Sequence, residues 1–567
     1  MVRGRGIAVL KASVVVPVYN AGAYIDRCAP SLTGQSIGPD AYEVIYVDDG
    51  STDDSAQRLA RLAARFPHVR VHAQENSGWP GKPRNVGIRM ARGAYVHFVD
   101  QDDELAPDAL ERLYALAARN RSDIVFGKAH GEMQGPGNIF RFTRERCSVR
   151  DTELFETLTP HKMFRRAFLL EHGIEFPEGR VRLEDQLFLA RAYPLAKTVS
   201  ILGDHPVYHW QRRGDGGNNS SRPPSPEDYY GHLRNVVRAV KERSEPGEVQ
   251  DRMLRRNYRV EILRPVTEPR VLQRTGRQLE RHFRIVRDLA REEFPPGVAA
   301  GLPGVAGLRA HLLEQGNLDG LVALGRRAGA VRLHVEVGAA RWRGGRLTLP
   351  LRVWLVHGDG SPVSLVRRPG GGFLLDPGML ADIPGQDAWE IQDPFAYAHG
   401  EVLVKDPRRT LYWYPETDLR PRLEDLGEDR CHVVLAADTV IDPLTLAGGG
   451  PLDPGRYELW MDVQSLGLGR RPRVTLPERA RRAGHPGRRA ARLAVVGTPP
   501  RMVVAAWNGP GGQLQLRVAP PRKTSLRRTV LIGAAADERL HTPARAVFRR
   551  LPPAARARLR RSLRPDE

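Results

Sequence analysis

The chain has 567 residues, of which 41% are hydrophobic and 27% are charged, as in an ordinary globular protein. Its 87 Lys and Arg outnumber 66 Asp and Glu, for a formal net charge of +21. The length exceeds what one hydrophobic core supports and predicts roughly three domains. Excess positive charge attracts polyanions such as nucleic acid, anionic lipid or a phosphate-bearing polymer, and a genome that favours Arg over Lys explains it equally well.

The three cysteines, Cys28, Cys147 and Cys431, lie far apart and match no metal-binding spacing. A sparse, odd set argues against a disulfide framework and for a reducing compartment. The first apolar stretch is too short for a signal peptide and is typical of a strand. No segment approaches the roughly 18 apolar residues of a membrane span. We therefore expect a cytoplasmic protein that is at most peripheral at the inner face of the membrane.

Strands and helices alternate from Ser13 to about Asp123. Helices are expected at residues 23–35, 53–65 and 84–91, between the apolar runs SVVVPVY, YEVIYVDD, VRVHAQ and AYVHFVD. This alternation predicts an α/β domain with a parallel sheet covered on both faces. In such sheets ligands bind at the carboxyl ends of the strands. Polar clusters fall at those ends, at residues 19–20, 48–51, 75–77 and 100–103.

Three regions are expected to follow a first domain of residues 1–230. Residues 231–328 read as a helical, Arg-rich linker domain. Residues 329–525 contain short alternating runs with Gly and Pro turns, typical of a β-sandwich of one or two immunoglobulin-like modules. An Arg/Pro-rich stretch at residues 470–492 interrupts these runs, and residues 526–567 form a basic tail. The runs are RLHVEV, RLTLPLRVWLV, TLYWY, CHVVLAA, RYELWMDV, ARLAVV, RMVVAAW and QLQLRV.

Two acidic motifs end predicted strands. VDDGSTDD, at residues 47–54, suits a ligand site and a helix cap equally well, since Asp and Ser are good capping residues. In VDQDD, Asp100 and Asp102 are two apart and can face the same side of an extended chain. Carboxylates that close repel unless a cation lies between them, and Mn²⁺ or Mg²⁺ is the natural occupant. Such an ion would stabilise a diphosphate leaving group, whereas a solvated loop is the alternative.

Four motifs in order, SVVVPVYN, EVIYVDDGSTDDS, NSGWPGKPRNVGI and GAYVHFVDQDD, resemble the family-2 glycosyltransferases. The resemblance covers roughly the first 230 residues. It implies the Rossmann-like GT-A fold and an enzyme with a nucleotide-sugar donor and the DQDD segment as its DxD element. It also implies base and ribose contacts for Pro17, Tyr19 and Asp48, nucleotide contacts for Asn76 and Arg84, a ribose or sugar contact for Asp100 beside Gln101, and metal coordination by Asp102.

The motif RLEDQLFLARAY opens an amphipathic helix with Glu184 and Asp185. Acidic residues at a helix start are explained simply by the helix dipole. Inversion at an anomeric carbon, however, needs a base that takes the proton of the acceptor hydroxyl. The family resemblance implies that this pair supplies the base, with Asp185 at the matching position. It thus implies an inverting, metal-dependent hexosyltransferase.

A polar, Gly-rich segment, YHWQRRGDGGNNSS, follows. Such loops can close over phosphates because free N–H groups and guanidinium favour dianions. Arg212, Arg213, Ser220 and Ser221 are therefore predicted to contact the diphosphate. His209 is predicted as a further metal ligand, although a lone His is more often structural.

Within the family, SGxPGxPRNVGI, EDQ and the NxSS loop resemble the wall teichoic acid glycosyltransferases. This resemblance implies a UDP-sugar donor, N-acetylglucosamine or another hexose as the sugar, and poly(ribitol-phosphate) or a similar cell-wall polymer as acceptor. It further implies a homo-oligomer, of which a trimer is one form.

Two other functions fit the same sequence. One is capsular or exopolysaccharide synthesis on a lipid-linked glycan, with the basic tail in peripheral contact with the membrane. The other is an inactive polyanion- or carbohydrate-binding protein, against which the intact Asp48, Asp100, Asp102 and Asp185 argue. Nucleic acid is not expected as a partner, because its binding motifs are missing from the sequence.

Overall fold

The computed structural model describes residues 10–131, 137–214, 224–475, 492–498, 501–508 and 512–521. The predicted site residues Ser220 and Ser221, most of the Arg/Pro-rich stretch and the basic tail lie outside these ranges. Chain contacts divide the protein into two compact units. The first comprises Met1–Leu302, Ala306–Arg326 and Asp382–Pro384, and the second Pro303–Val305, Arg327–Ala381 and Gly385–Glu567.

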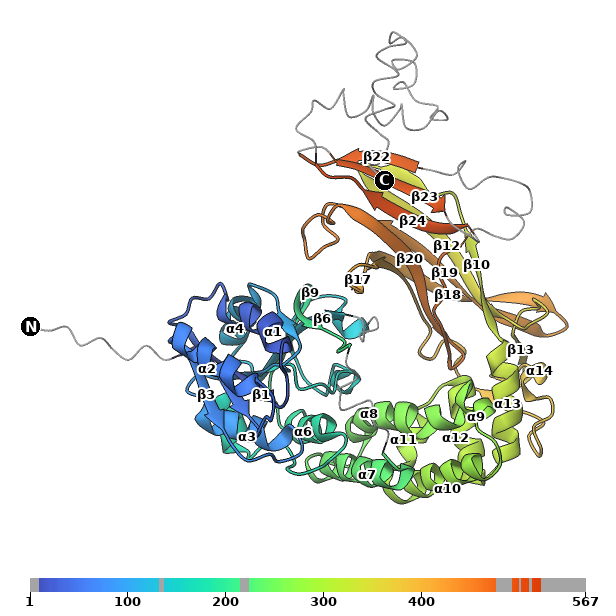
Figure 1. The fold of residues 1–567 in the computed structure, drawn as a ribbon. Helices are drawn as coiled ribbons and strands as arrows, with labels where there is room; N and C mark the ends of the chain where they lie inside the picture. The colour runs from blue at the N-terminus through green and yellow to red at the C-terminus, as the bar shows by residue number, and fades with distance from the viewer. Residues whose placement is uncertain are drawn as a thin grey trace, which may run out of the picture. The chain divides into compact units, whose positions relative to one another are not determined.

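A mixed sheet forms the centre of the first unit, in the order β3-β2-β1-β4-β8-β6-β9-β5. Figure 1 labels its strands β1, β3, β6 and β9. The four predicted strands are confirmed as β1 (Ala12–Val18), β2 (Tyr42–Asp48), β3 (Val69–Ala73) and β4 (Tyr95–Phe98). They run parallel to one another. Every residue of β1 and β2 is buried, as expected for strands covered on both faces.

The three helices predicted between these strands are confirmed as α1 (Tyr24–Thr33), α2 (Ser55–Arg65) and α3 (Gly81–Met90). The rest of the sheet was not predicted, and β8 runs antiparallel to β4 and β6. These further elements are α4 (Ala109–Asn120), α5 (Arg166–Glu171), β5 (Glu104–Leu105), β6 (Ile124–Gly131), β7 (Arg144–Cys147), β8 (Met163–Arg165) and β9 (Val199–Trp210). The segment before β8 and the end of β9 thereby come to lie beside the DQDD segment. The helix predicted to open with Glu184 and Asp185 is confirmed as α6 (Glu184–Ala192).

Helices form the remainder of the first unit and lead into the second, as predicted. Glu293 of α10 is buried and accepts hydrogen bonds from Arg234, Arg238 and Lys241 of α7, which joins these two helices. The helices are α7 (Pro226–Glu242), α8 (Glu248–Asn257), a π-helical stretch (Tyr258–Leu263), α9 (Arg270–Gln273), α10 (Gly276–Glu293), α11 (Pro296–Ala300), α12 (Gly304–Gln315) and α13 (Leu318–Ala330). Within the described ranges, no helix is both long enough and apolar enough to cross a membrane.

Two antiparallel sheets form the second unit, which confirms the predicted C-terminal β structure. One has the order β10-β12-β19-β13-β14-β15, and the other β17-β16-β20-β24-β23-β22. A Cβ at Gly400 of β16 would lie 3.2 Å from Leu419 and 3.4 Å from Leu435 of the first sheet, so the sheets pack closely there.

The strands of the first sheet are β10 (Arg332–Val337), β11 (Arg341–Arg343), β12 (Arg346–Val356), β13 (Ser364–Arg367), β14 (Phe373–Leu375), β15 (Glu390–Ile391), β18 (Glu416–Gly427) and β19 (Arg430–Ile441). Those of the second are β16 (His399–Asp406), β17 (Leu411–Trp413), β20 (Gly455–Ser465), β21 (Leu468–Arg470), β22 (Arg492–Val496), β23 (Arg501–Asn508) and β24 (Gln513–Val518). A short helix, α14 (Pro377–Leu380), lies between β14 and β15.

Close packing of α3 on β1 can be tested at Gly87. A Cβ there would lie 2.2 Å from Cγ1 of Val15, a buried residue. Gly87→Ala should lower the free energy of unfolding by about 1–3 kcal/mol, the usual cost of overpacking a core. Urea denaturation measures the change. Gly231→Ala in α7 is the matched control, because a Cβ there meets nothing within 4 Å and Ala favours a helix by about 1 kcal/mol. Equal stability of the two variants would contradict the close approach.

Candidate active site

The carboxyl ends of β1 and β4 are joined through the DQDD segment. Gln101 accepts a hydrogen bond from the Tyr19 N–H at 2.9 Å and donates one to the Tyr19 carbonyl at 3.2 Å. Pro17, two residues earlier, is buried within β1. Tyr19 is 46% exposed. Gln101 thus fixes the backbone of a residue that was itself predicted to bind the donor.

A second junction lies at the end of β2. Asp48 is buried, and its carboxylate accepts the N–H of Ser51 at 3.0 Å. Asn76 donates to the Asp49 carbonyl at 2.9 Å, which ties the segment after β3 to the end of β2. The Asp49 carboxylate accepts from Ser77, a role that was not predicted. The predicted nucleotide-binding residues Asp48 and Asn76 therefore lie on adjacent, mutually bonded segments.

Arg84 of α3 joins three carboxylates that are distant in sequence. Its guanidinium donates to Asp100 at 2.9 Å and to Asp185 at 2.7 Å, and lies 3.7 Å from Glu184. The residue is 2% exposed. Both terminal nitrogens of Arg84 donate to acidic side chains, and its place near the nucleotide stays a prediction. The predicted base and the first Asp of the DxD element are thus held on one cation.

The carboxylates around Arg84 differ in their affinity for protons. Burial and the neighbouring Glu184 raise the pKa of Asp185 to about 7, against the opposing effect of Arg84. Burial also raises the pKa of Glu184. Burial alone would raise the pKa of Asp100 as well, but the hydrogen bond from His161 and the charge and hydrogen bond of Arg84 outweigh it and hold that pKa well below its usual range. Asp100 is therefore a permanent anion and Asp185 a group that can exchange a proton near neutrality.

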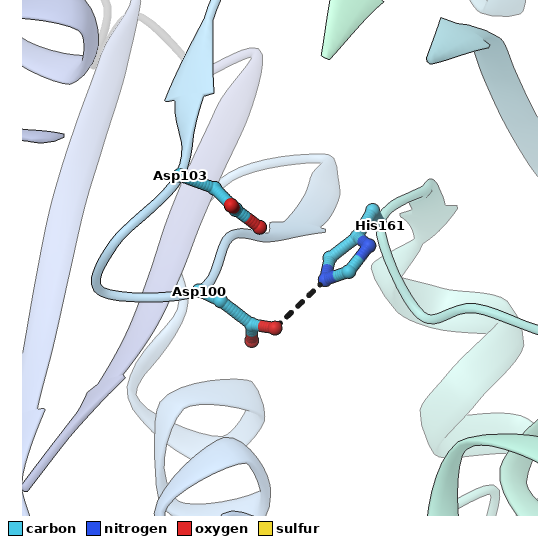
Figure 2. A group of neighbouring side chains, drawn as sticks. All are labelled: Asp100, Asp103 and His161. Carbon is cyan, nitrogen blue, oxygen red and sulfur yellow. Dashed lines mark hydrogen bonds and ion pairs between the residues drawn. The ribbon is translucent and has the colours of Figure 1, made fainter. Parts of the chain in front are cut away.

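Asp100 also belongs to a group of potential metal ligands on its side away from Arg84 (Figure 2). Ligand atoms of Asp100, Asp103 and His161 all lie within 4.8 Å of one another. Carboxylate oxygen and imidazole nitrogen are donors that suit Mn²⁺, while Mg²⁺ prefers oxygen. Asp103 and His161 were not predicted as site residues. Asp103 accepts hydrogen bonds from the Tyr208 hydroxyl at 2.7 Å and from the Gln211 N–H at 2.8 Å.

Neither predicted metal ligand belongs to that group. Asp102 is half-buried on the same segment. His209 of β9 pairs in register with Glu104 of β5, with its Nδ1 3.7 Å from the Glu104 carboxylate, and stacks on His130. Metal coordination by Asp102 and His209 stays a prediction.

The two arginines predicted to contact a diphosphate follow β9. Arg212 is exposed. Arg213 donates to the Asn20 carbonyl at 3.4 Å, and its guanidinium carbon lies 4.6 Å from the centre of the Tyr24 ring. Arg213 is thus near the segment that follows β1.

Comparison with known proteins agrees with this geometry. The model of glycosyl transferase family 2 matches residues 13–183, and that of the glycosyl transferase TarS linker domain matches residues 226–325. The fold is therefore the predicted GT-A fold followed by a helical linker and β-sheets. The chain belongs to glycosyltransferase family 2.

The chain is 38% identical over 236 residues to the poly(ribitol-phosphate) beta-glucosyltransferase of Bacillus spizizenii, which covers 41% of this chain and 37% of that protein. It is 30% identical over 239 residues to the poly(ribitol-phosphate) beta-N-acetylglucosaminyltransferase TarP of Staphylococcus aureus. This match covers 41% of this chain and 72% of TarP. The crystal structure of S. aureus TarS 1-349 in complex with UDP-GlcNAc matches at 27% identity and a TM-score of 0.51, over 62% of this chain and 98% of that one. Less than half the length of the B. spizizenii relative is therefore matched.

Removal of the Arg84 cation tests its role as the common partner. Arg84→Met should lower the free energy of unfolding by about 2–4 kcal/mol, because three carboxylates would be left together without a counter-charge. The value lies below that for a fully buried pair, since the Asp100 and Asp185 side chains are 33% and 31% exposed. Arg89→Met on the same helix removes an exposed pair and should change stability by less than about 0.5 kcal/mol. Similar urea midpoints for the two variants would contradict this role.

Proposed function

We propose that the chain is an inverting, metal-dependent glycosyltransferase that moves a hexose such as N-acetylglucosamine from a UDP-sugar to a hydroxyl of a phosphate-rich cell-wall polymer. The observation that carries this is the pairing of Asp100 and Asp185 on Arg84, one a permanent anion and the other able to exchange a proton. The names of the relatives, which are poly(ribitol-phosphate) transferases, support the polymer as acceptor. The TarS complex supports UDP-GlcNAc as donor.

Asp185 is the proposed general base. Its side chain is 31% exposed, so an acceptor hydroxyl can reach it. The hydroxyl oxygen attacks the anomeric carbon on the face opposite UDP, the Asp185 carboxylate takes the hydroxyl proton, and the bond from carbon to the diphosphate oxygen breaks with its electrons leaving on UDP. One displacement of this kind inverts the anomeric centre. Glu184 contributes electrostatically by raising the proton affinity of Asp185.

The donor is proposed to lie along the strand ends. The exposed ring of Tyr19, the turn of Asp48 and the segment of Asn76 would bind the base and ribose beside Pro17, while Asp100 contacts the ribose or sugar. Arg212 and Arg213 are the proposed diphosphate contacts, together with Ser220 and Ser221, which stay predictions. Arg84 keeps the donor-binding Asp100 and the base Asp185 at a fixed separation, which favours a reactive alignment of donor and acceptor.

A divalent ion, Mn²⁺ or Mg²⁺, is proposed at the DQDD segment, held by Asp102 with His209 as a further ligand. Such an ion neutralises charge on the departing diphosphate. Their positions relative to Glu104 support Asp102 and His209 as joint ligands. His209 of β9 pairs with Glu104 of β5, and Asp102 is two residues before Glu104 in the sequence.

The proposed base can be tested with Asp185→Asn, which keeps the shape of the side chain but cannot accept the proton. Transfer should fall roughly 10²-fold or more, while the Kd for UDP-sugar changes little. Turnover and calorimetric titration measure the two quantities. Asp151→Asn, in an exposed turn, is the control and should retain full turnover. A parallel loss of binding and rate in Asp185→Asn would make Asp185 a structural residue instead.

The same base sets the pH dependence of the wild-type protein. A protonated Asp185 cannot accept a proton, so kcat/KM should rise as pH increases through the pKa of about 7 and level off above it. In Asp185→Asn the residual rate should lose this ascending limb.

Asp102→Ala tests the metal proposal. UDP release should lose its dependence on added Mn²⁺ and fall roughly 10²-fold, because the leaving group loses its counter-ion. Asp108→Ala, which removes a carboxylate paired with Arg112 and His205, is the control and should keep the metal response. Near wild-type, metal-stimulated release by Asp102→Ala would remove this assignment.

The acceptor is proposed to contact an aromatic and basic patch on the outer face of the second sheet. The Lys405 ammonium lies 5.6 Å from the centre of the Tyr412 ring and 5.7 Å from that of Trp460, and the Arg473 guanidinium lies 5.1 Å from Trp460. Trp460 is half-buried, with its indole N–H on Glu458. A flat ring flanked by cations suits a polymer of polyols, sugars and phosphates.

Trp460→Ala should raise the KM for long poly(ribitol-phosphate) about fivefold, the scale of one aromatic contact, and leave the KM for short acceptor fragments unchanged. Trp354→Ala, which alters a half-buried Trp of the other sheet, is the control. Equal kinetics of Trp460→Ala and wild type on long polymer, at low and high salt, would exclude this patch as the acceptor site.

One assay tests the whole proposal. UDP release and sugar incorporation are measured for a panel of UDP-sugars with Mn²⁺, in the presence of teichoic acid polymer or lipid-linked glycan. We expect the sugar to be incorporated into the polymer. Incorporation only into lipid-linked glycan would show that the glycan, and not the polymer, is the acceptor. A homo-oligomer and a peripheral membrane contact through the basic tail stay predictions.

A further inference from the structure

His161 lies between an indole and a carboxylate. Its Nδ1 accepts the Nε1–H of Trp210 at 2.9 Å, and its Nε2 lies 3.1 Å from Oδ2 of Asp100. The His161 side chain is 8% exposed. Both ring nitrogens therefore have defined partners in a largely buried position (Figure 2 shows the Asp100 side).

The chemistry of these partners specifies the protonation of the ring. An indole N–H can only donate, so the His161 nitrogen that faces Trp210 must present a lone pair. A carboxylate that is ionised can only accept, so the nitrogen that faces Asp100 must carry a proton. One arrangement satisfies both contacts: a neutral imidazole with its proton on Nε2.

The ring has little freedom to leave this arrangement. It stacks on Tyr208, with centroids 4.3 Å apart and planes inclined by 21°. The Tyr208 hydroxyl donates to Asp103 and accepts the Asp100 N–H at 3.2 Å. Tyr208 and Trp210, both of β9, thus hold the His161 ring and the backbone of the DQDD segment together.

We infer that Trp210 fixes His161 as the Nε2–H tautomer. His161 is then a positioning residue that donates to Asp100, and its Nε2 has no lone pair with which His161 could coordinate a metal ion. A metal ion at Nε2 would need a lone pair there and hence the proton on Nδ1, where it would face the Trp210 N–H. The spatial group of Asp100, Asp103 and His161 is therefore a hydrogen-bonded support. Its nitrogen ligand is unsuited to the ion that the fold implies.

The consequence for Asp100 follows from its two oxygens. Arg84 donates to Oδ1 and His161 donates to Oδ2, so the carboxylate is prevented from rotating. The effect on donor binding rests on the proposed function, in which Asp100 contacts the ribose or sugar. The tautomer of His161 and its exclusion from the metal site do not depend on sugar transfer.

The tautomer is measured by NMR on the full chain labelled with ¹⁵N in histidine only. His161 ring signals are assigned by their loss in His161→Gln. We expect the correlation pattern of a neutral ring protonated at Nε2 in the wild type. In Trp210→Phe, which keeps an aromatic ring but loses the N–H, we expect a second proton on Nδ1, because Asp100 still faces the Nε2 proton and no donor faces Nδ1. A ring protonated at Nδ1 in the wild type, or an unchanged pattern in Trp210→Phe, would overturn the inference.

Metal and donor binding separate the positioning role from ligation. Mn²⁺ affinity, measured by electron paramagnetic resonance with UDP present, should stay within about threefold of wild type in His161→Gln, whose amide can donate in place of Nε2. A loss of roughly tenfold or more, as for a ligand, would overturn the exclusion. His161→Ala should weaken UDP-GlcNAc binding roughly tenfold, the scale of a hydrogen bond to a charged group, and His161→Gln should restore most of it.

His205→Gln is the matched control, because His205 makes an equivalent bond to Asp108 at 2.9 Å elsewhere on β9. It should leave both affinities unchanged. Unchanged UDP-GlcNAc binding in folded His161→Ala would overturn the positioning role while leaving the tautomer result intact. If the transferase assays fail altogether but the NMR pattern is as expected, the proposed function fails and the tautomer inference stands.

Discussion

The site depends on one buried guanidinium. Arg84 is the cation at which α3, the end of β4 and the start of α6 meet, and it offsets the repulsion among Asp100, Glu184 and Asp185. A buried cation is costly unless its partners satisfy it, so such a cluster forms only where the backbone delivers all of them together. The close approach of Gly87 to Val15 packs α3 against β1 and so fixes the position of the Arg84 backbone. Packing in the sheet is in this way a condition of the electrostatics of the site.

The opposite side of the DQDD segment is held by different physics. There the support comes from β9, through the hydroxyl of Tyr208, the indole of Trp210 and the ring of His161. These donors are neutral, so they hold the segment by hydrogen bonds and ring stacking without adding charge. The electrostatic potential near Asp100 and Asp102 is therefore set on this side by the carboxylates. A segment held from both sides in this way is already ordered, which suits the metal ion and the diphosphate proposed to bind there.

The sequence predicted those parts whose signal is local. Apolar strands and amphipathic helices around β1 to β4 repeat with clear periods, and the motif residues sit where those strands end. β18 was not predicted because its sequence, ETDLRPRLEDLG, is polar, and it forms through pairing with β19 along most of its length. His161 and Trp210 show no local pattern in the sequence. They lie 61 and 110 residues from Asp100, and the fold brings His161 to Asp100 and Trp210 to His161. The pairing of Arg84 with Asp100 and Asp185 was not predicted for the same reason, since its acidic partners come from other elements.

The distribution of charge bears on the two explanations of the +21 excess. Residues 470–492 contain nine Arg and one acidic residue, and residues 526–567 contain eleven Arg and four acidic residues. Most of the net charge therefore resides in these two stretches. Elsewhere, arginines are commonly paired, as Arg352 is with Glu336 and Glu424, and Arg409 with Asp406 and Asp453. A codon bias would raise arginine along the whole chain without regard to acidic neighbours, whereas concentration into two stretches favours a polyanionic partner such as the proposed polymer. Attraction of that kind acts at the range of the Debye length, about 10 Å, so it would gather a long acceptor without dictating which hydroxyl reaches Asp185.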